Sequence, residues 1–149
     1  MLHYDGQHWS KIDPHVANAQ LSGFAFISPD EGWAVGTLPN TDQRRPSEMD
    51  GLILHYANGV WQQQELLKDP QGYPYFSFSS VAMVAQNEGW AVGDEGVILH
   101  YHNGAWGQVQ SPTGQALNSI VMVSPDEGWA VGDGVIVHYQ AGSWRVYNG

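Results

Sequence analysis

The sequence contains no cysteine among its 149 residues. This absence excludes a disulfide framework and a thiolate metal site, and it leaves the redox compartment undecided. Basic side chains are also few, since 5 lysines and arginines stand against 15 aspartates and glutamates, for a formal net charge of -10. Such a charge repels phosphate backbones and anionic membrane surfaces, so we expect no nucleic-acid partner.

Long apolar runs are missing too. No stretch approaches the roughly 18 to 20 apolar residues of a membrane span, and the opening MLHYDGQHW lacks the basic start and apolar stretch of a signal peptide. We therefore expect a soluble chain without membrane insertion, in a compartment that the sequence does not name. What the chain does have is 18 glycines and 12% aromatic residues, a mixture typical of short strands and tight turns rather than of disorder.

An internal repeat organises the chain. The string GWAVG occurs at residues 32–36, 89–93 and 128–132. Each copy is followed by a second string, GLILHYANGVW, GVILHYHNGAW or GVIVHYQAGSW. The chain opens with LHYDGQHW, which corresponds to the second string alone. The order is therefore half a repeat followed by three whole repeats.

Each whole repeat predicts four short strands. The first is an apolar run (24–27, 81–84 and 120–123), which we expect to be innermost and covered on both faces. The string SPDEG at 28–32 and 124–128 predicts a tight turn into the second strand, which alternates large and small side chains.

The third and fourth strands form a hairpin. Asn58-Gly59 and Asn103-Gly104 mark its turn, and Asn-Gly is the strongest short hairpin signal. The tryptophans and histidines that recur in these strands are interpreted as structural, packing within or between repeats: Trp33, Trp90, Trp129, Trp61, Trp106, Trp144, His55, His100 and His138.

Four strands in about 40 residues, with an apolar innermost strand, predict an all-β propeller of about three and a half blades rather than a sandwich. The segments are a half blade with the third and fourth strands (1–20), blade 1 with loop insertions (21–77), blade 2 (78–116) and blade 3 (117–149). Because propellers close with about four to eight blades, we expect the ring to be completed by self-association or by further sequence.

These strings carry a family resemblance. GWAVG, then G-x-I-L-H-Y, then N-G-x-W resembles the repeat of bacterial BNR or Asp-box propellers, and is similar to the photosystem II assembly and stability factor type. The Asp-box itself is degenerate, since residues 58–61 and 103–106 keep the turn and the tryptophan but lose the Ser, the Thr and the spacing. The resemblance implies a scaffold that acts on membrane protein subunits, while related Asp-box propellers include sialidases and glycan-binding proteins.

Catalytic constellations are not evident. A sialidase needs three convergent arginines, but the chain has only Arg44, Arg45 and Arg145, of which two are adjacent in a loop and the third lies in an outer strand. The sequence has no Gly-x-Ser-x-Gly elbow, phosphate-binding glycine loop or His-Glu-x-x-His string. We predict that the chain is not an enzyme and uses no cofactor.

Histidines raise the question of a metal. His3 recurs at the same strand position as His55, His100 and His138, and equivalent positions in different blades lie too far apart to share an ion. His100 and His102 point to one face of a strand, but two ligands without a third make weak evidence, so we predict no metal site.

Extra sequence gathers on one face of the predicted disc, in the links at 37–51 and 65–77. Insertions on one face of a repeat protein often mark its binding surface, although tolerated decoration is the alternative. We predict a ligand-binding face that includes Arg44, Arg45, Lys68, Tyr73, Tyr75 and Phe76.

The sequence therefore predicts a non-catalytic propeller module that binds a protein or a glycan through this loop-bearing face. Two alternatives stay open. One is a self-assembling scaffold whose main role is ring formation, and the other is a sialidase-like glycosidase fragment.

Overall fold

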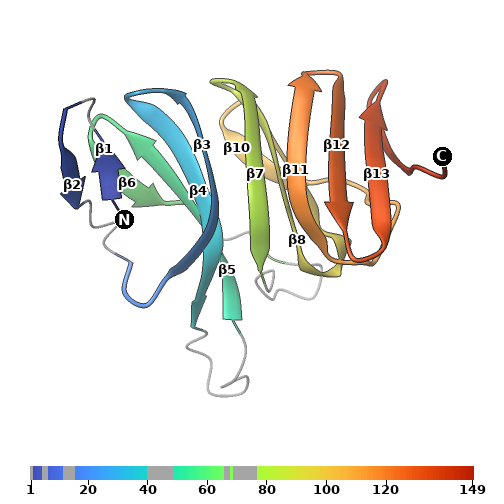
Figure 1. Cartoon of the computed structure of the whole chain (residues 1–149), viewed down its shortest axis with the longest axis horizontal. Coiled ribbons are helices and arrows are strands. Elements are labelled where there is room, and N and C mark those ends of the chain that lie inside the picture. Colours follow the sequence, from blue (N-terminus) through green and yellow to red (C-terminus); the bar gives the residue numbers. More distant parts are fainter. Residues whose placement is uncertain (1, 5–6, 12–15, 40–48, 66–67, 69–76) are drawn as a thin grey trace.

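The computed structural model describes residues 2–4, 7–11, 16–39, 49–65, 68 and 77–149, and it is built from antiparallel strands (Figure 1). Three four-stranded sheets follow one another along the chain, each in sequence order, after a two-stranded hairpin. The predicted all-β fold of consecutive propeller blades is thus confirmed, in the form of a partial propeller that is not closed.

The three sheets are named blades I, II and III. Blade I contains β3 (Gln20–Ser28), β4 (Glu31–Pro39), β5 (Met49–Ala57) and β6 (Val60–Gln63). Blade II contains β7 (Phe78–Ala85), β8 (Glu88–Gly93), β9 (Ile98–His102) and β10 (Ala105–Gln108), with a 3-10 turn at Asp94–Gly96 between β8 and β9. Blade III contains β11 (Leu117–Ser124), β12 (Glu127–Gly132), β13 (Val135–Gln140) and β14 (Ser143–Val146). The opening hairpin pairs β1 (Leu2–Tyr4) with β2 (Trp9–Lys11).

The hairpin turns between the third and fourth strands show why these residues fold this way. In blades I and II, Asn58 and Asn103 both adopt a φ of 52°, and the glycine that follows each also has positive φ. Two successive residues in this region make the type I′ turn, whose twist matches that of the flanking strands. Blade III makes the same turn with Ala141 and Gly142.

Blades pack face to face through their apolar side chains. At the interface of blades I and II, Trp33, Val35 and Ile53 pack with a set from blade II that includes Val81, Leu99, Tyr101 and Trp106. At the interface of blades II and III, the equivalent residues of the next two repeats pack together: Trp90, Val92, Ile98, Ile120, Val137, Tyr139 and Trp144. One blade face therefore always meets the opposite face of the next blade.

The expectation that the first strands are covered on both faces is wrong for β3 and β11. Phe24 in β3 is 70% exposed, and Val121 in β11 is 58% exposed. Alternate side chains of a strand point to opposite blade faces. Within the described chain, no further four-stranded blade packs on the blade I face that carries Phe24 or on the blade III face that carries Val121. Ile120, which occupies the position of Phe24 in blade III, is only 7% exposed because blade II covers it.

The described residues include no helix with the length and apolar character that a membrane crossing requires.

Candidate functional site: blade faces and a groove between blades II and III

A glutamate, a histidine and a tryptophan form the same arrangement in each blade. In blade I, Glu31 begins β4 and contacts the His55 ring at 3.4 Å, and that ring stacks on Trp33 with centroids 4.2 Å apart. Trp33 and His55 lie directly opposite each other on paired strands. The stacks recur for Trp90 with His100 at 4.0 Å and for Trp129 with His138 at 3.8 Å.

The next blade covers this tryptophan at both internal interfaces. The Trp33 ring packs on Tyr101 of blade II with ring centroids 4.6 Å apart, and it forms a T-shaped pair with Trp106 at a centroid distance of 5.4 Å. Trp90 meets Tyr139 and Trp144 of blade III at 4.6 and 5.5 Å. Tilted and edge-on aromatic pairs stabilise by roughly 0.5–1.5 kcal/mol beyond the area that they bury.

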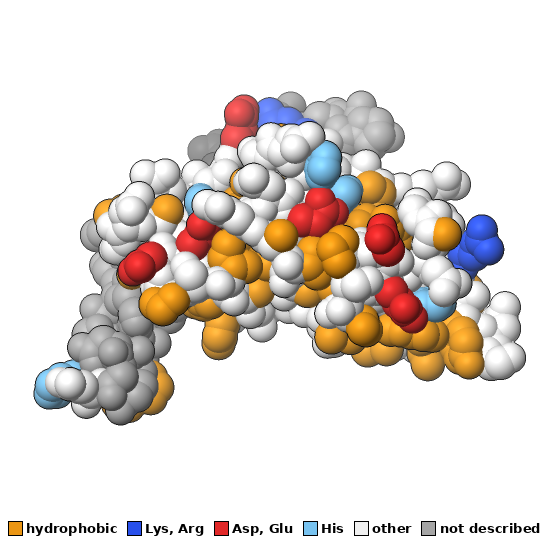
Figure 2. Space-filling model, turned by 90° about the horizontal axis from the view of Figure 1, so that it is seen from above, with side chains coloured by type: hydrophobic (Ala, Val, Ile, Leu, Met, Phe, Trp, Pro, Cys, Tyr) orange, Lys and Arg blue, Asp and Glu red, His pale blue; other side chains and the backbone are white. Residues whose placement is uncertain are grey.

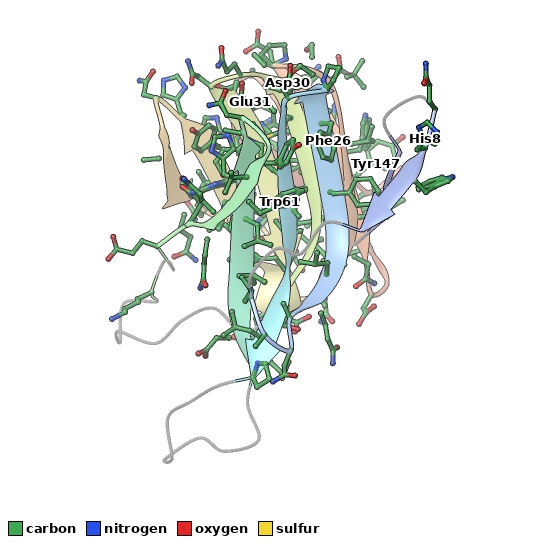
Figure 3. The ribbon with its side chains drawn as sticks, turned by 90° about the vertical axis from the view of Figure 1, so that its left-hand side faces the viewer. His8, Phe26, Asp30, Glu31, Trp61 and Tyr147 are labelled. Carbon is green, nitrogen blue, oxygen red and sulfur yellow. The ribbon has the colours of Figure 1, made fainter. Side chains whose placement is uncertain are left out.

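The two outer blade faces present the same residue types without a further blade. On blade III, Trp129 contacts the edge of Tyr147 at 5.2 Å, and Val131 and Ile136 are each 44% exposed. On blade I, Phe26 packs edge-on against Trp61 at 6.0 Å, as Figure 3 shows from that side. We call these the open face of blade III and the open face of blade I. By repeat position they are the two halves of one interface.

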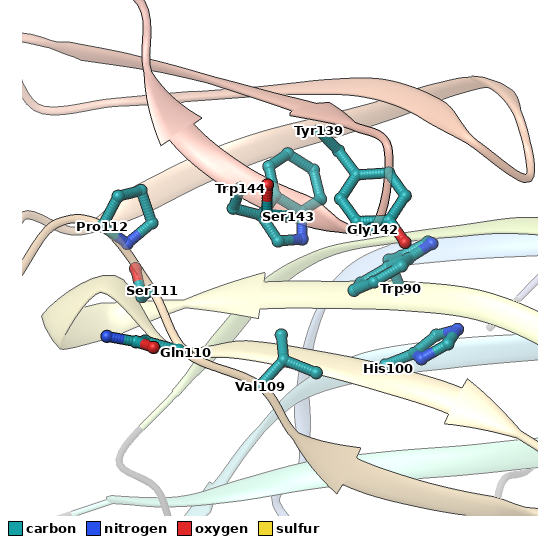
Figure 4. Close-up of a pocket in the computed structure, with 10 residues that line it drawn as sticks. All are labelled: Trp90, His100, Val109, Gln110, Ser111, Pro112, Tyr139, Gly142, Ser143 and Trp144. Atoms are coloured by element: carbon teal, nitrogen blue, oxygen red, sulfur yellow. The ribbon is translucent and has the colours of Figure 1, made fainter.

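A groove of about 420 Å³ lies between blades II and III (Figure 4). Aromatic rings form much of its lining, and the segment after β10 forms another part of it. The lining residues are Trp90, His100, Val109, Gln110, Ser111, Pro112, Tyr139, Gly142, Ser143 and Trp144. Apolar rings with a few polar groups between them are the composition of ligand pockets in general.

The segment after β10 is held in place by its own hydrogen bonds. Val109 donates its backbone N–H to Ile98 at 3.1 Å, and Ser111 donates its hydroxyl to the backbone carbonyl of Thr113 at 3.0 Å. The Thr113 N–H donates back to the Ser111 hydroxyl at 3.4 Å. This lining of the groove is therefore preformed, which lowers the entropy cost of binding.

Burial and nearby carboxylates set the charge of the groove. Burial raises the pKa of the Tyr139 phenol above its ordinary value of 10.0, and the charges of Asp126 and Glu88 raise it further. The phenol therefore stays neutral at physiological pH and can donate a hydrogen bond.

Blade II differs from the other two blades in the number of histidines that contact the glutamate at the start of its second strand. Glu88 contacts both His100 and His102, the latter at 2.8 Å. Partial burial by itself would raise the pKa of the Glu88 carboxyl, but the hydrogen bonds and positive charges of the two histidines outweigh it, so this pKa lies below its ordinary value.

The structure leaves most of the predicted loop-bearing face unassigned. Arg44, Arg45, Tyr73, Tyr75 and Phe76 lie outside the described residues, and Lys68 is exposed. Arg145, the third arginine weighed for sialidase chemistry, is exposed in β14. The groove was not predicted, because the sequence of its 109–112 segment reads as an ordinary link between strands.

No family model matches the chain, and no curated protein matches it. Solved structures do. One, described as YCF48 bound to D1 peptide, is 22% identical with a TM-score of 0.64, over 87% of this chain and 40% of that one. YCF48 from Cyanidioschyzon merolae is 23% identical with a TM-score of 0.59, over 87% of this chain and 37% of that one.

The chain has a β-propeller fold. It spans about two fifths of the length of these neighbours. The resemblance to the photosystem II assembly factor type is supported at the level of fold, whereas the Asp-box assignment stays a prediction.

Proposed function

We propose that this chain is a non-catalytic propeller module that binds a segment of a partner protein in the groove between blades II and III. The groove itself is the observation that carries the proposal, because it combines about 420 Å³ of volume with aromatic walls and a preformed segment. Val109 and Pro112 offer apolar contact to side chains of an extended segment, beside the largely buried rings of Trp90, Tyr139 and Trp144. Ser143 and Gln110 stand beside them as hydrogen-bonding groups.

The comparison with solved structures supports a protein partner. The YCF48 structure of similar fold holds a D1 peptide, so a propeller of this kind accommodates a protein segment. A glycan is the alternative ligand, for which Gln110, Ser111 and Ser143 would supply hydrogen bonds.

The loop-bearing face forms a second part of the proposal. The predicted contact residues of this face are Arg44, Arg45, Tyr73 and Tyr75, which lie outside the described residues, and the two arginines would favour an acidic partner segment. If binding of an identified peptide is unchanged when all four are replaced with alanine, this part of the proposal is wrong and the groove acts without it.

Peptide display followed by calorimetry tests the groove. Peptides are selected on the whole chain, beginning with the D1 peptide as a first probe, and their affinity is compared between wild type and Ser143→Arg. The arginine would fill the groove, so we expect at least about tenfold weaker binding. Val60→Arg is the matched control, since Val60 begins β6 at the position of Ser143 in blade I. Equal binding by wild type and Ser143→Arg contradicts the proposal.

Self-association is a second candidate function, favoured by the two open faces. The open face of blade III carries Trp129, Val131 and Ile136, and the open face of blade I exposes Phe24 and Phe26. These are the residue types that meet at both internal interfaces. A head-to-tail contact between copies would bury both open faces and extend the ring.

A further inference from the structure

Blade II carries a cluster of three metal-ligating side chains at the end where the short turns lie. Glu88 comes from β8, and His100 and His102 come from β9. One ligand atom of each lies within 4.8 Å of the other two. Viewed from this end, histidine side chains lie directly against acidic ones near the middle of the molecule (Figure 2).

Comparison of the three blades shows which contacts of this cluster belong to the repeat and which occur in blade II alone. Every blade pairs the glutamate that begins its second strand with the histidine that stacks on its tryptophan: Glu31 with His55, Glu88 with His100, and Glu127 with His138. That pair belongs to the repeat and needs no ion. Blade II alone adds a second histidine among these three blades.

Strand register shows how the addition arises. Glu88 lies directly opposite His102 on paired strands. The same register places Ala57 opposite Glu31 in blade I and Gln140 opposite Glu127 in blade III. One residue difference at this position therefore changes a two-residue pair into three potential ligands.

We propose that Glu88, His100 and His102 bind a zinc ion. Two imidazole nitrogens and one carboxylate oxygen form a donor set of borderline softness that suits Zn²⁺ and not Mg²⁺ or Ca²⁺, which take oxygen ligands. The ion would replace the contacts between the Glu88 carboxylate and the two rings, at bond lengths of about 2.0–2.2 Å.

The surroundings of the site fit this role. His100 is held by its stack on Trp90, so one ligand is oriented before the ion arrives. His102 is exposed on 58% of its side chain, so its ring can rotate toward the ion. This exposure also leaves a fourth position open to solvent or to a donor from another molecule. The site goes beyond the proposed protein-binding role, because it needs no peptide.

Calorimetric titration of the whole chain with ZnCl₂ in metal-free buffer tests the proposal, and the absorption bands of Co²⁺ report the coordination geometry. We expect wild type to bind one ion per chain. His102→Gln, which gives blade II the residue found in blade III, would weaken binding at least about tenfold. Thermal unfolding of both proteins in EDTA shows whether the variant folds like wild type.

The reciprocal variant supplies the matched control. Gln140→His would give blade III the arrangement of blade II, and we expect it to bind a second zinc ion. The proposal is overturned if wild type binds no zinc, if His102→Gln binds it as tightly as wild type, or if Gln140→His gains no second ion.

Discussion

The interface between blades II and III and the open face of blade III are built from the same repeat positions but have different surroundings. Val92 and Ile98 are fully buried, whereas Val131 and Ile136 at the equivalent positions are each 44% exposed. Trp90 is covered by Tyr139 and Trp144 of the next blade, while Trp129 contacts Tyr147 from its own terminal segment. The repeat therefore determines which side chains a face presents, and the neighbouring blade determines how much those side chains stabilise.

The largest expected effect tests this difference directly. Replacing Trp90 with Ala removes a ring buried between two blades, so we expect a loss of about 3–5 kcal/mol in the free energy of unfolding. Trp129→Ala at the open face should cost less than half as much, because part of its ring is already in water. Urea unfolding of both variants measures the two losses, and equal losses would contradict the comparison.

Charged substitutions on the open face of blade III test whether copies of the chain associate through this face. Val131→Lys with Ile136→Lys would make this face polar without touching the internal interfaces, so we expect it to abolish association between copies. Light scattering across concentrations should give 16.4 kDa for the variant and a larger mass for wild type.

Phe24→Lys on the open face of blade I is the reciprocal variant of that test. It should have the same effect, because a head-to-tail contact uses both faces. Association that survives both sets of changes would show that copies meet elsewhere.

A smaller effect is expected at Tyr147. Its ring contacts Trp129 at 5.2 Å in place of a neighbouring blade. Tyr147→Ala should lower the free energy of unfolding by about 0.5–1.5 kcal/mol, the value of one aromatic pair. The same measurement on Tyr147→Phe is the control, since phenylalanine keeps the ring, and a loss there equal to that of alanine would place the effect in the hydroxyl.

The smallest effect concerns pH. The folded-state pKa of Glu88 lies below its ordinary value of 4.5, so the stability that this carboxylate contributes is present above pH 4.5. That contribution is lost as the pH falls through the folded-state pKa. Wild type should therefore exceed Glu88→Gln in stability near neutral pH, and the gap should close in acid. A gap that is constant with pH would contradict the ion pairing of Glu88 with the histidines.

Much of the fold could be predicted from the sequence because each blade is specified locally. The turn residues at Asn58-Gly59 and the alternation around Trp33 fix a four-stranded sheet without reference to distant residues. The burial of individual side chains could not be predicted from the sequence in the same way, because it depends on which blades lie next to each other. The runs at 24–27 and 120–123 are apolar throughout, like the run at 81–84, and the presence of a neighbouring blade separates exposed Phe24 from buried Val81.

The candidate sites were harder to predict, because they depend on which strands lie opposite each other. His100 and His102 were recognised as sharing a face, but the third ligand, Glu88, becomes visible only through the pairing of β8 with β9. The groove likewise brings 109–112 beside Ser143 and Trp144, which are about 30 residues further along the chain. The register of the GWAVG string against the HYHNG string could have suggested Glu88, since blades I and III use the same register.

The most direct test of the proposed function is the position of a bound peptide, measured by NMR on the isotopically labelled chain. We predict that a peptide selected by display shifts the backbone signals of 109–112 and Ser143 and the indole signals of Trp90 and Trp144, which line the groove. Signals of the blade I strands β3–β6, including the Trp61 indole, should stay unchanged. Shifts confined to the open faces or to blade I would contradict the assignment of the groove as the binding site.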